Sequence, residues 1–87
     1  MILDLGKPVH ISYVVIAEDI SDGESIREYE LFGKAGGDWI SLSKGSSIGH
    51  KRIEKVNGEF TTIKLEVLKS DGRPVIKKLA CYSYRNE

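Results

Sequence analysis

Apolar and polar residues alternate along most of this chain, and this two-residue period constrains its fold more than any other feature of the sequence. The alternation is clearest over residues 9–17, 26–32, 63–67 and 75–84. It is the pattern of β-strands, and no segment has the three-to-four-residue period of an amphipathic helix. Turn signals recur about every 8–15 residues, the spacing typical of β-sandwiches and barrels. The sequence therefore predicts an all-β, antiparallel fold.

Three local patterns refine this prediction. Residues 9–17 are apolar on one face at first and on both faces later, which is typical of a central strand. Ile26 is out of phase with the strand that follows it, which indicates a β-bulge. Asn57-Gly58 carries the strongest two-residue hairpin signal, because both residues tolerate the positive φ of a type I′ turn. We therefore expect one strand to end and the next to begin at that pair.

The chain already has a strand pattern at its first residues, Leu3-Asp4-Leu5-Gly6. An open antiparallel sheet that begins there would expose an unpaired edge. No repeat or linker divides the 87 residues. We therefore expect residues 1–87 to form one domain, cut from a longer protein and lacking the N-terminal strands of its own sheet.

Composition excludes several classes of function. The chain has 13 Lys and Arg residues against 13 Asp and Glu residues, whereas a general nucleic-acid binder carries an excess of basic residues. No apolar run approaches the roughly 20 residues of a membrane span. One cysteine, Cys81, excludes an internal disulfide and a cysteine-based zinc site, and we expect it to be a buried small side chain. We expect no nucleic-acid partner, no membrane partner and no cofactor.

Charge is balanced overall but is distributed unevenly along the chain. Residues 18–30 carry six acids and one base, whereas residues 44–55 carry four bases and one acid. The basic stretch has too few aromatic neighbours to stack the bases of a single-stranded nucleic acid. We hypothesise that the two stretches form ion pairs within the molecule or with another domain.

The acidic residues do not indicate catalysis or metal binding. Glu28 and Glu30 share a strand face, and retaining glycoside hydrolysis needs two carboxylates about 5–5.5 Å apart. Alternation nevertheless places this pair on the solvent side of its strand. Asp19, Asp22 and Glu24 lack the spacing of an EF-hand calcium loop, so we expect a solvated loop and no metal site.

Sugar recognition combines an aromatic platform with polar side chains at a loop rim. The candidate carbohydrate-binding residues are Trp39, His50 and Arg52, with Tyr82 or Tyr84 as further aromatic residues. For Trp39 and His50 the alternative is a packing role. For Arg52, together with Lys51, the alternative is a bidentate brace between loops.

Several spaced motifs resemble one known family. The most specific, Gly45-Ser46-Ser47-Ile48-Gly49-His50-Lys51-Arg52-Ile53, is similar to a family pattern Gly-Thr-Thr-Ile-Gly-Tyr/His-Lys-Arg-Ile/Leu. The others are Leu3–Pro8, Val14–Ile20, Gly23–Tyr29, Trp39 and Arg73–Ile76, with Arg73 replacing the usual acid. Together they resemble the C-terminal β-sandwich domain of the α-L-fucosidases of glycoside hydrolase family 29. In that resemblance the structural motif residues are Gly45, Ile48, Gly49, Lys51 and Arg52.

The resemblance implies an antiparallel jelly-roll β-sandwich of the galactose-binding-like class, related to discoidin domains. It also implies a parent α-L-fucosidase whose catalytic carboxylates lie in a separate (β/α)₈ barrel. This chain would then be a non-catalytic accessory domain that packs on the barrel and binds glycan weakly at most. The parent would be exported to the periplasm, the extracellular space or the lysosome. The alternative is an independent carbohydrate-binding module.

Overall fold

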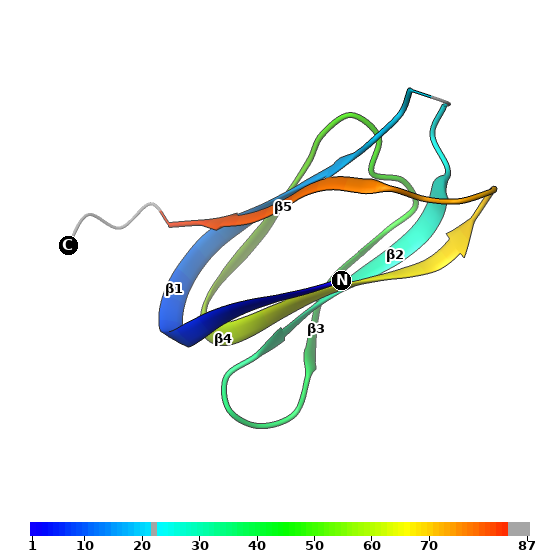
Figure 1. The fold of residues 1–87 in the computed structure, drawn as a ribbon. Coiled ribbons are helices and arrows are strands. Elements are labelled where there is room, and N and C mark those ends of the chain that lie inside the picture. The colour runs from blue at the N-terminus through cyan, green and yellow to red at the C-terminus, as the bar shows by residue number, and fades with distance from the viewer. Residues whose placement is uncertain (22, 84–87) are drawn as a thin grey trace.

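The computed structural model describes residues 1–21 and 23–83, which form five antiparallel strands in one sheet (Figure 1). The strands are β1 (Ile2–Glu18), β2 (Ile26–Lys34), β3 (Ile40–Gly45), β4 (Arg52–Ser70) and β5 (Ile76–Tyr82). Their order in the sheet is β3-β2-β4-β1-β5. The described residues contain no helix, and so no helix that is long and apolar enough to cross a membrane. The prediction of an all-β antiparallel fold is confirmed.

The sheet folds over on itself because its two longest strands bend. β1 has 17 residues and β4 has 19, about three times the usual length of a strand. Both turn at the same end of the molecule in Figure 1. The second half of β1 pairs with β5 and with the first half of β4. The second half of β4 pairs with the beginning of β1 and with β2, which pairs with β3.

This bending produces the two layers of the predicted sandwich. We call the half that contains β5 the β5 layer and the half that contains β2 and β3 the β2 layer. The two layers face each other in Figure 1 and are continuous with one another through β1 and β4. The expected sandwich is therefore confirmed.

Irregular pairing marks both bends. In β1, residues 5–8 stand opposite a single residue of β4, and Gly6 in that segment has a φ of +80°. In β4, residues 56 and 57 stand opposite one residue of β1, and Asn57 has a φ of +51°. The two-against-one arrangement in β4 is a β-bulge, and the four-against-one arrangement in β1 is a larger irregularity of the same kind.

The expected hairpin at Asn57-Gly58 is therefore wrong. The pair lies inside β4, where Gly58 pairs with Ile11 and Lys55 pairs with Tyr13. A positive φ suits a bulge as well as a turn, and the pairing with β1 keeps the strand continuous. The bulge expected at Ile26 is confirmed, because the pairing of β2 with β4 shifts between Ile26 and Glu28.

One hydrophobic core lies between the layers. Val14 and Ile16 come from the β5 layer, and Tyr29, Leu31 and Leu65 come from the β2 layer; all five are at most 1% exposed. Fully burying an aliphatic side chain of this size stabilises the fold by about 1.5–3 kcal/mol. The same cluster takes in residues of both bent strands, so the core holds the fold-over in place.

The remaining expectations for the strands are met. The second half of β1 lies between β4 and β5, and its outward residues Val15 and Ala17 are buried as well. The strand is therefore central and covered on both faces, as its sequence predicts. Residues 2–8 of β1 have a strand on one side only among the described residues. The open edge expected from residues 3–6 is present.

Candidate functional site

The loop between β3 and β4 carries the most specific sequence motif, and a buried carboxylate fastens it to the sheet. Glu18, at the end of β1, is 1% exposed. Its Oε2 accepts hydrogen bonds from the backbone N–H groups of Ser25 (2.7 Å) and Ile26 (3.1 Å). Its Oε1 accepts one from Gly49 (3.3 Å), while the Glu18 N–H donates to the Gly49 carbonyl (2.9 Å). One side chain thus ties both neighbouring loops to the end of β1.

This role of Glu18 was not predicted, because the residue was assigned only to the acidic stretch 18–30 that was expected to form ion pairs. A signal for it was present. Glu18 is in phase with Val14 and Ile16, and residues two apart on a strand point to the same face. Parity alone therefore places this carboxylate toward the core, where it needs hydrogen-bond donors.

The motif glycines sit where a larger side chain would clash or strain the backbone. Gly45 lies against Tyr29, and a Cβ at Gly45 would come within 2.5 Å of that ring. Gly49 has a φ of +67°, a conformation that side-chain-bearing residues rarely adopt. Ile48 between them is 4% exposed and joins the core cluster. These contacts support the proposal that Gly45, Ile48 and Gly49 serve structure.

Arg52 points into a second buried polar cluster. The Tyr29 hydroxyl donates to Glu54 Oε2 (2.8 Å), and the Ser43 hydroxyl donates to the same oxygen. Arg52 Nε lies 3.5 Å from the other carboxylate oxygen. Burial, reinforced by the hydrogen bond to Glu54, raises the pKa of Tyr29 above its ordinary value. Arg52 therefore compensates a buried charge, and sequence analysis had not assigned this role to Glu54.

Trp39 lies just before β3, in contact with two lysines of the β2 layer. The Lys34 Nζ is 5.3 Å from the centroid of the Trp39 ring, and the Lys64 Nζ is 4.6 Å from it. The same Lys64 Nζ is 4.7 Å from the Phe32 ring. These distances are those of cation–π contacts. Trp39 is half-buried and makes these contacts with both lysines.

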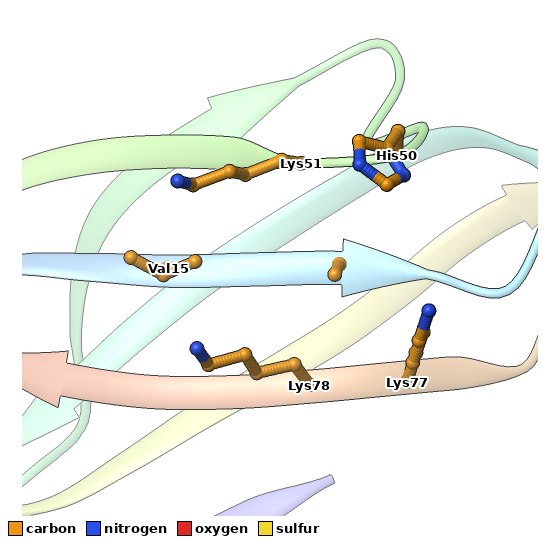
Figure 2. A pocket seen from close by; sticks show the side chains of 6 residues that line it. Val15, His50, Lys51, Lys77 and Lys78 are labelled. Atoms are coloured by element: carbon orange, nitrogen blue, oxygen red, sulfur yellow. The ribbon is translucent and has the colours of Figure 1, made fainter.

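His50 lines a cavity of about 330 Å³ on the outside of the β5 layer (Figure 2). The other lining residues are Val15, Ala17, Lys51, Lys77 and Lys78. Trp39, His50 and Arg52 thus occupy three different environments: Trp39 contacts two lysines of the β2 layer, His50 lines the cavity on the β5 layer, and Arg52 lies beside Glu54. Their combination in one sugar site stays a prediction. Of the further aromatic residues, Tyr82 stacks on Tyr13 with ring centroids 5.1 Å apart, and Tyr84 lies outside the described residues.

The acidic residues that raised the question of catalysis are placed outside the core. Glu30 accepts a hydrogen bond from the Ser41 hydroxyl (2.6 Å), and Glu28 lines an open hollow beside Lys44. The N–H and hydroxyl of Ser21 lower the pKa of Asp19, and Asp22 lies outside the described residues. Among residues 1–21 and 23–83, no three His, Cys, Asp or Glu side chains are grouped to hold a metal.

Within the described part of the chain, three ion pairs are formed, Arg27–Asp71, Arg52–Glu54 and Lys64–Glu66. None of them joins the acidic stretch 18–30 to the basic stretch 44–55. The hypothesis that these two stretches form ion pairs with each other is therefore not supported by the described residues. Pairing with another domain stays a prediction.

The fold defines the class of domain. The chain is similar to the module CBM32-2 of a GH31 protein, solved bound to GalNAc, with a TM-score of 0.77 over 94% of this chain and 62% of that one. At 15% identity this likeness shows the fold alone. The domain has a galactose-binding-like β-sandwich fold.

Two longer proteins narrow this class to a family. The chain is 41% identical to a protein of Bacteroides thetaiotaomicron assigned as an α-L-fucosidase, with a TM-score of 0.92 over 98% of this chain and 20% of that one. It is 33% identical to a GH29 fucosidase of Ruminococcus gnavus solved with fucose, with a TM-score of 0.85 over 93% of this chain and 17% of that one. No family model and no curated protein sequence matches.

The chain is thus a homologue of a β-sandwich domain of the glycoside hydrolase family 29 α-L-fucosidases, and the resemblance drawn from its motifs is confirmed. It spans no more than a fifth of the length of these two relatives.

Proposed function

We propose that this chain is the C-terminal accessory domain of an α-L-fucosidase. In this proposal the parent protein hydrolyses terminal α-L-fucosides of glycans with a separate (β/α)₈ barrel, on which the present domain packs. One observation carries the proposal: the chain aligns over 98% of its length, at 41% identity, with only 20% of an assigned α-L-fucosidase. The parent is exported, as befits an enzyme that acts on glycans.

The uses of the carboxylates support a non-catalytic role. A retaining glycosidase needs two carboxylates that face one sugar-sized cleft. Here the carboxylate of Glu18 accepts hydrogen bonds from three backbone N–H groups. The carboxylate of Glu54 accepts hydrogen bonds from the hydroxyls of Tyr29 and a serine and forms an ion pair with an arginine. Glu18 and Glu54 therefore stabilise the sandwich from within it.

The test compares three forms of the protein: the complete reading frame, the same frame without residues 1–87, and the 87-residue chain alone. Hydrolysis of nitrophenyl α-L-fucoside is measured for each, together with the thermal unfolding midpoint. We expect activity in the complete protein, none in the 87-residue chain, and a lower midpoint when the domain is removed. A reading frame without a barrel upstream of Ile2, or hydrolysis by the chain alone, would contradict the proposal.

A carbohydrate-binding module is the second candidate, favoured by the fold it shares with a module solved bound to GalNAc. Trp39 and His50 are the residues to monitor in amide NMR during titration with fucose or galactose. Shifts that cluster at both residues support this candidate. The absence of shifts at millimolar sugar would contradict the binding-module candidate and favour the accessory role.

A further inference from the structure

The outer face of the β5 layer combines an aromatic pair with an apolar centre. In β1 the outward residues are Tyr13, Val15 and Ala17, two positions apart. Across the pairing with β5, Tyr13 stands opposite Tyr82 and Ala17 stands opposite Lys78. We call the surface formed by these residues and their cross-strand neighbours Lys55, Ile53 and Ala80 the outer face.

Three lysines and one histidine surround the end of the outer face nearest Ala17. The cavity there has a floor of Val15 and Ala17, which are 5% and 8% exposed. Figure 2 shows Lys51 and His50 on one side of β1 and Lys77 and Lys78 on the other. No carboxylate lines the cavity, and none of its three lysines takes part in the ion pairs of the described residues.

An anion placed in this cavity would relieve the repulsion among the three ammonium groups. The three lysines are exposed, so water and salt screen part of this repulsion, and a shared counter-charge brings a modest gain that falls with salt concentration. Asp19 lies outside the cavity lining, and its pKa is lowered mainly by the N–H and hydroxyl of Ser21, with Lys77 the smallest of the causes. The cavity therefore keeps a positive potential that a carboxylate or sulfate group can neutralise.

The aromatic pair extends the site beyond the charged groups. The Tyr13 and Tyr82 rings are stacked at 5.1 Å with an interplanar angle of 17°, and Tyr82 is 39% exposed. The Lys78 Nζ lies 5.8 Å from the centroid of the Tyr82 ring. Lys78 therefore lies between the aromatic pair and the cavity. Tyrosine rings bind apolar faces while their hydroxyls reach polar groups, which suits a sugar ring that carries a charged substituent.

We propose that the outer face binds an acidic glycan. A sugar ring packs on Tyr82, and the sulfate or carboxylate group of the glycan lies in the cavity between Lys51 and Lys78. This site goes beyond the accessory role, which needs no ligand, and it is distinct from the rim residue Trp39. It contains His50, a candidate from the sequence, but joins it to lysines of β5 rather than to Arg52.

The test titrates the 87-residue chain with five probes under amide NMR: galactose 6-sulfate, galacturonic acid, fucose, inorganic sulfate and a hexaglutamate peptide. The two acidic sugars separate a sulfate from a carboxylate ligand, and fucose reports any neutral-sugar binding. The test variant is Lys51→Gln with Lys78→Gln. The matched control is Lys44→Gln with Lys69→Gln, which removes two exposed lysines of the β2 layer. The dispersion of the amide spectrum shows that each variant is folded.

We expect at least one acidic sugar to shift the amides of Val15, Ala17 and Lys78, with no such shifts from fucose. Loss of both cavity lysines weakens binding about tenfold, and the control changes it less than twofold. Equal weakening in both variants would show diffuse charge attraction and overturn the proposal. So would inorganic sulfate that binds as tightly as the acidic sugars, or a hexaglutamate peptide that binds the outer face more tightly than they do.

Discussion

Glu18→Gln tests whether one buried carboxylate holds the motif loop and the β1–β2 loop to the sheet. Gln has nearly the same shape as Glu but keeps only one acceptor oxygen. If that oxygen takes the place of Oε2, it retains the bonds from Ser25 and Ile26. The amide NH₂ then faces the N–H of Gly49. Both groups are donors, so the 3.3 Å hydrogen bond from Gly49 to Oε1 is lost.

The size of the effect follows from these three contacts. A hydrogen bond to a charged group contributes about 1.5–3 kcal/mol and a neutral one about 0.5–1.5 kcal/mol, so each retained bond weakens by about 1 kcal/mol. The buried N–H of Gly49 left without an acceptor costs about 1–3 kcal/mol more. Removing the charge from a site that is 1% exposed recovers part of this as desolvation. We expect a net loss of about 2–3 kcal/mol in the free energy of unfolding.

The assay is urea unfolding followed by circular dichroism. A domain of this size has a stability of about 4–13 kcal/mol, so the predicted loss moves the midpoint visibly. The control is Glu59→Gln, an exposed acid on β4, which we expect to change stability by less than about 0.5 kcal/mol. Hydrogen exchange at the Gly49 amide should also accelerate in the Glu18 variant. Equal midpoints for the two variants would refute the assigned role of Glu18.

Three further predictions concern single residues. Gly45→Ala brings a Cβ within 2.5 Å of the Tyr29 ring and should cost about 1–3 kcal/mol in urea unfolding, whereas Gly37→Ala meets no atom within 4 Å; equal midpoints would contradict this contact. Because the pKa of Tyr29 is raised, its stabilising effect is complete below about pH 10 and is lost as the pH rises further. In Tyr29→Phe the free energy of unfolding, measured by urea titration, should fall less steeply above about pH 10. An unchanged dependence on pH would contradict this role of Tyr29. Burial raises the pKa of the Cys81 thiol, so a disulfide reagent should modify it more slowly in the folded chain than in urea; equal rates would disprove the protection.

Alternation in the sequence was sufficient to predict the strands and most of their buried faces. In the second half of β1, Val14 and Ile16 point into the core and Val15 and Ala17 point outward, as the period of two requires. Ile11 is in phase with Val15 but lies in the core, so the alternation does not hold across the bend of the strand. Asn57-Gly58 could not be assigned in the same way. A positive φ fits both a hairpin and a bulge, and the choice depends on the pairing of β4 with β1, which is remote in sequence.

The candidate site shows the same division between local and long-range information. Arg52 and Glu54 are two residues apart on one strand, so their contact could have been predicted from parity. The meeting of His50 with Lys77 and Lys78 could not, because it requires β4 and β5 to flank the same half of β1. No pattern within either segment contains that order of strands.

The uneven distribution of charge takes on a structural meaning once Glu18 and Glu54 are placed. Both are among the buried polar residues, and their donors lie inside the sandwich or at its loops. Their negative charges are therefore shielded by internal partners and contribute little to the outer face of the β5 layer. The lysines of that face are left without acidic neighbours in the cavity lining. A chain of zero net charge thus presents a basic surface because some of its acids are used to hold its loops, and that surface is where an acidic ligand would be attracted.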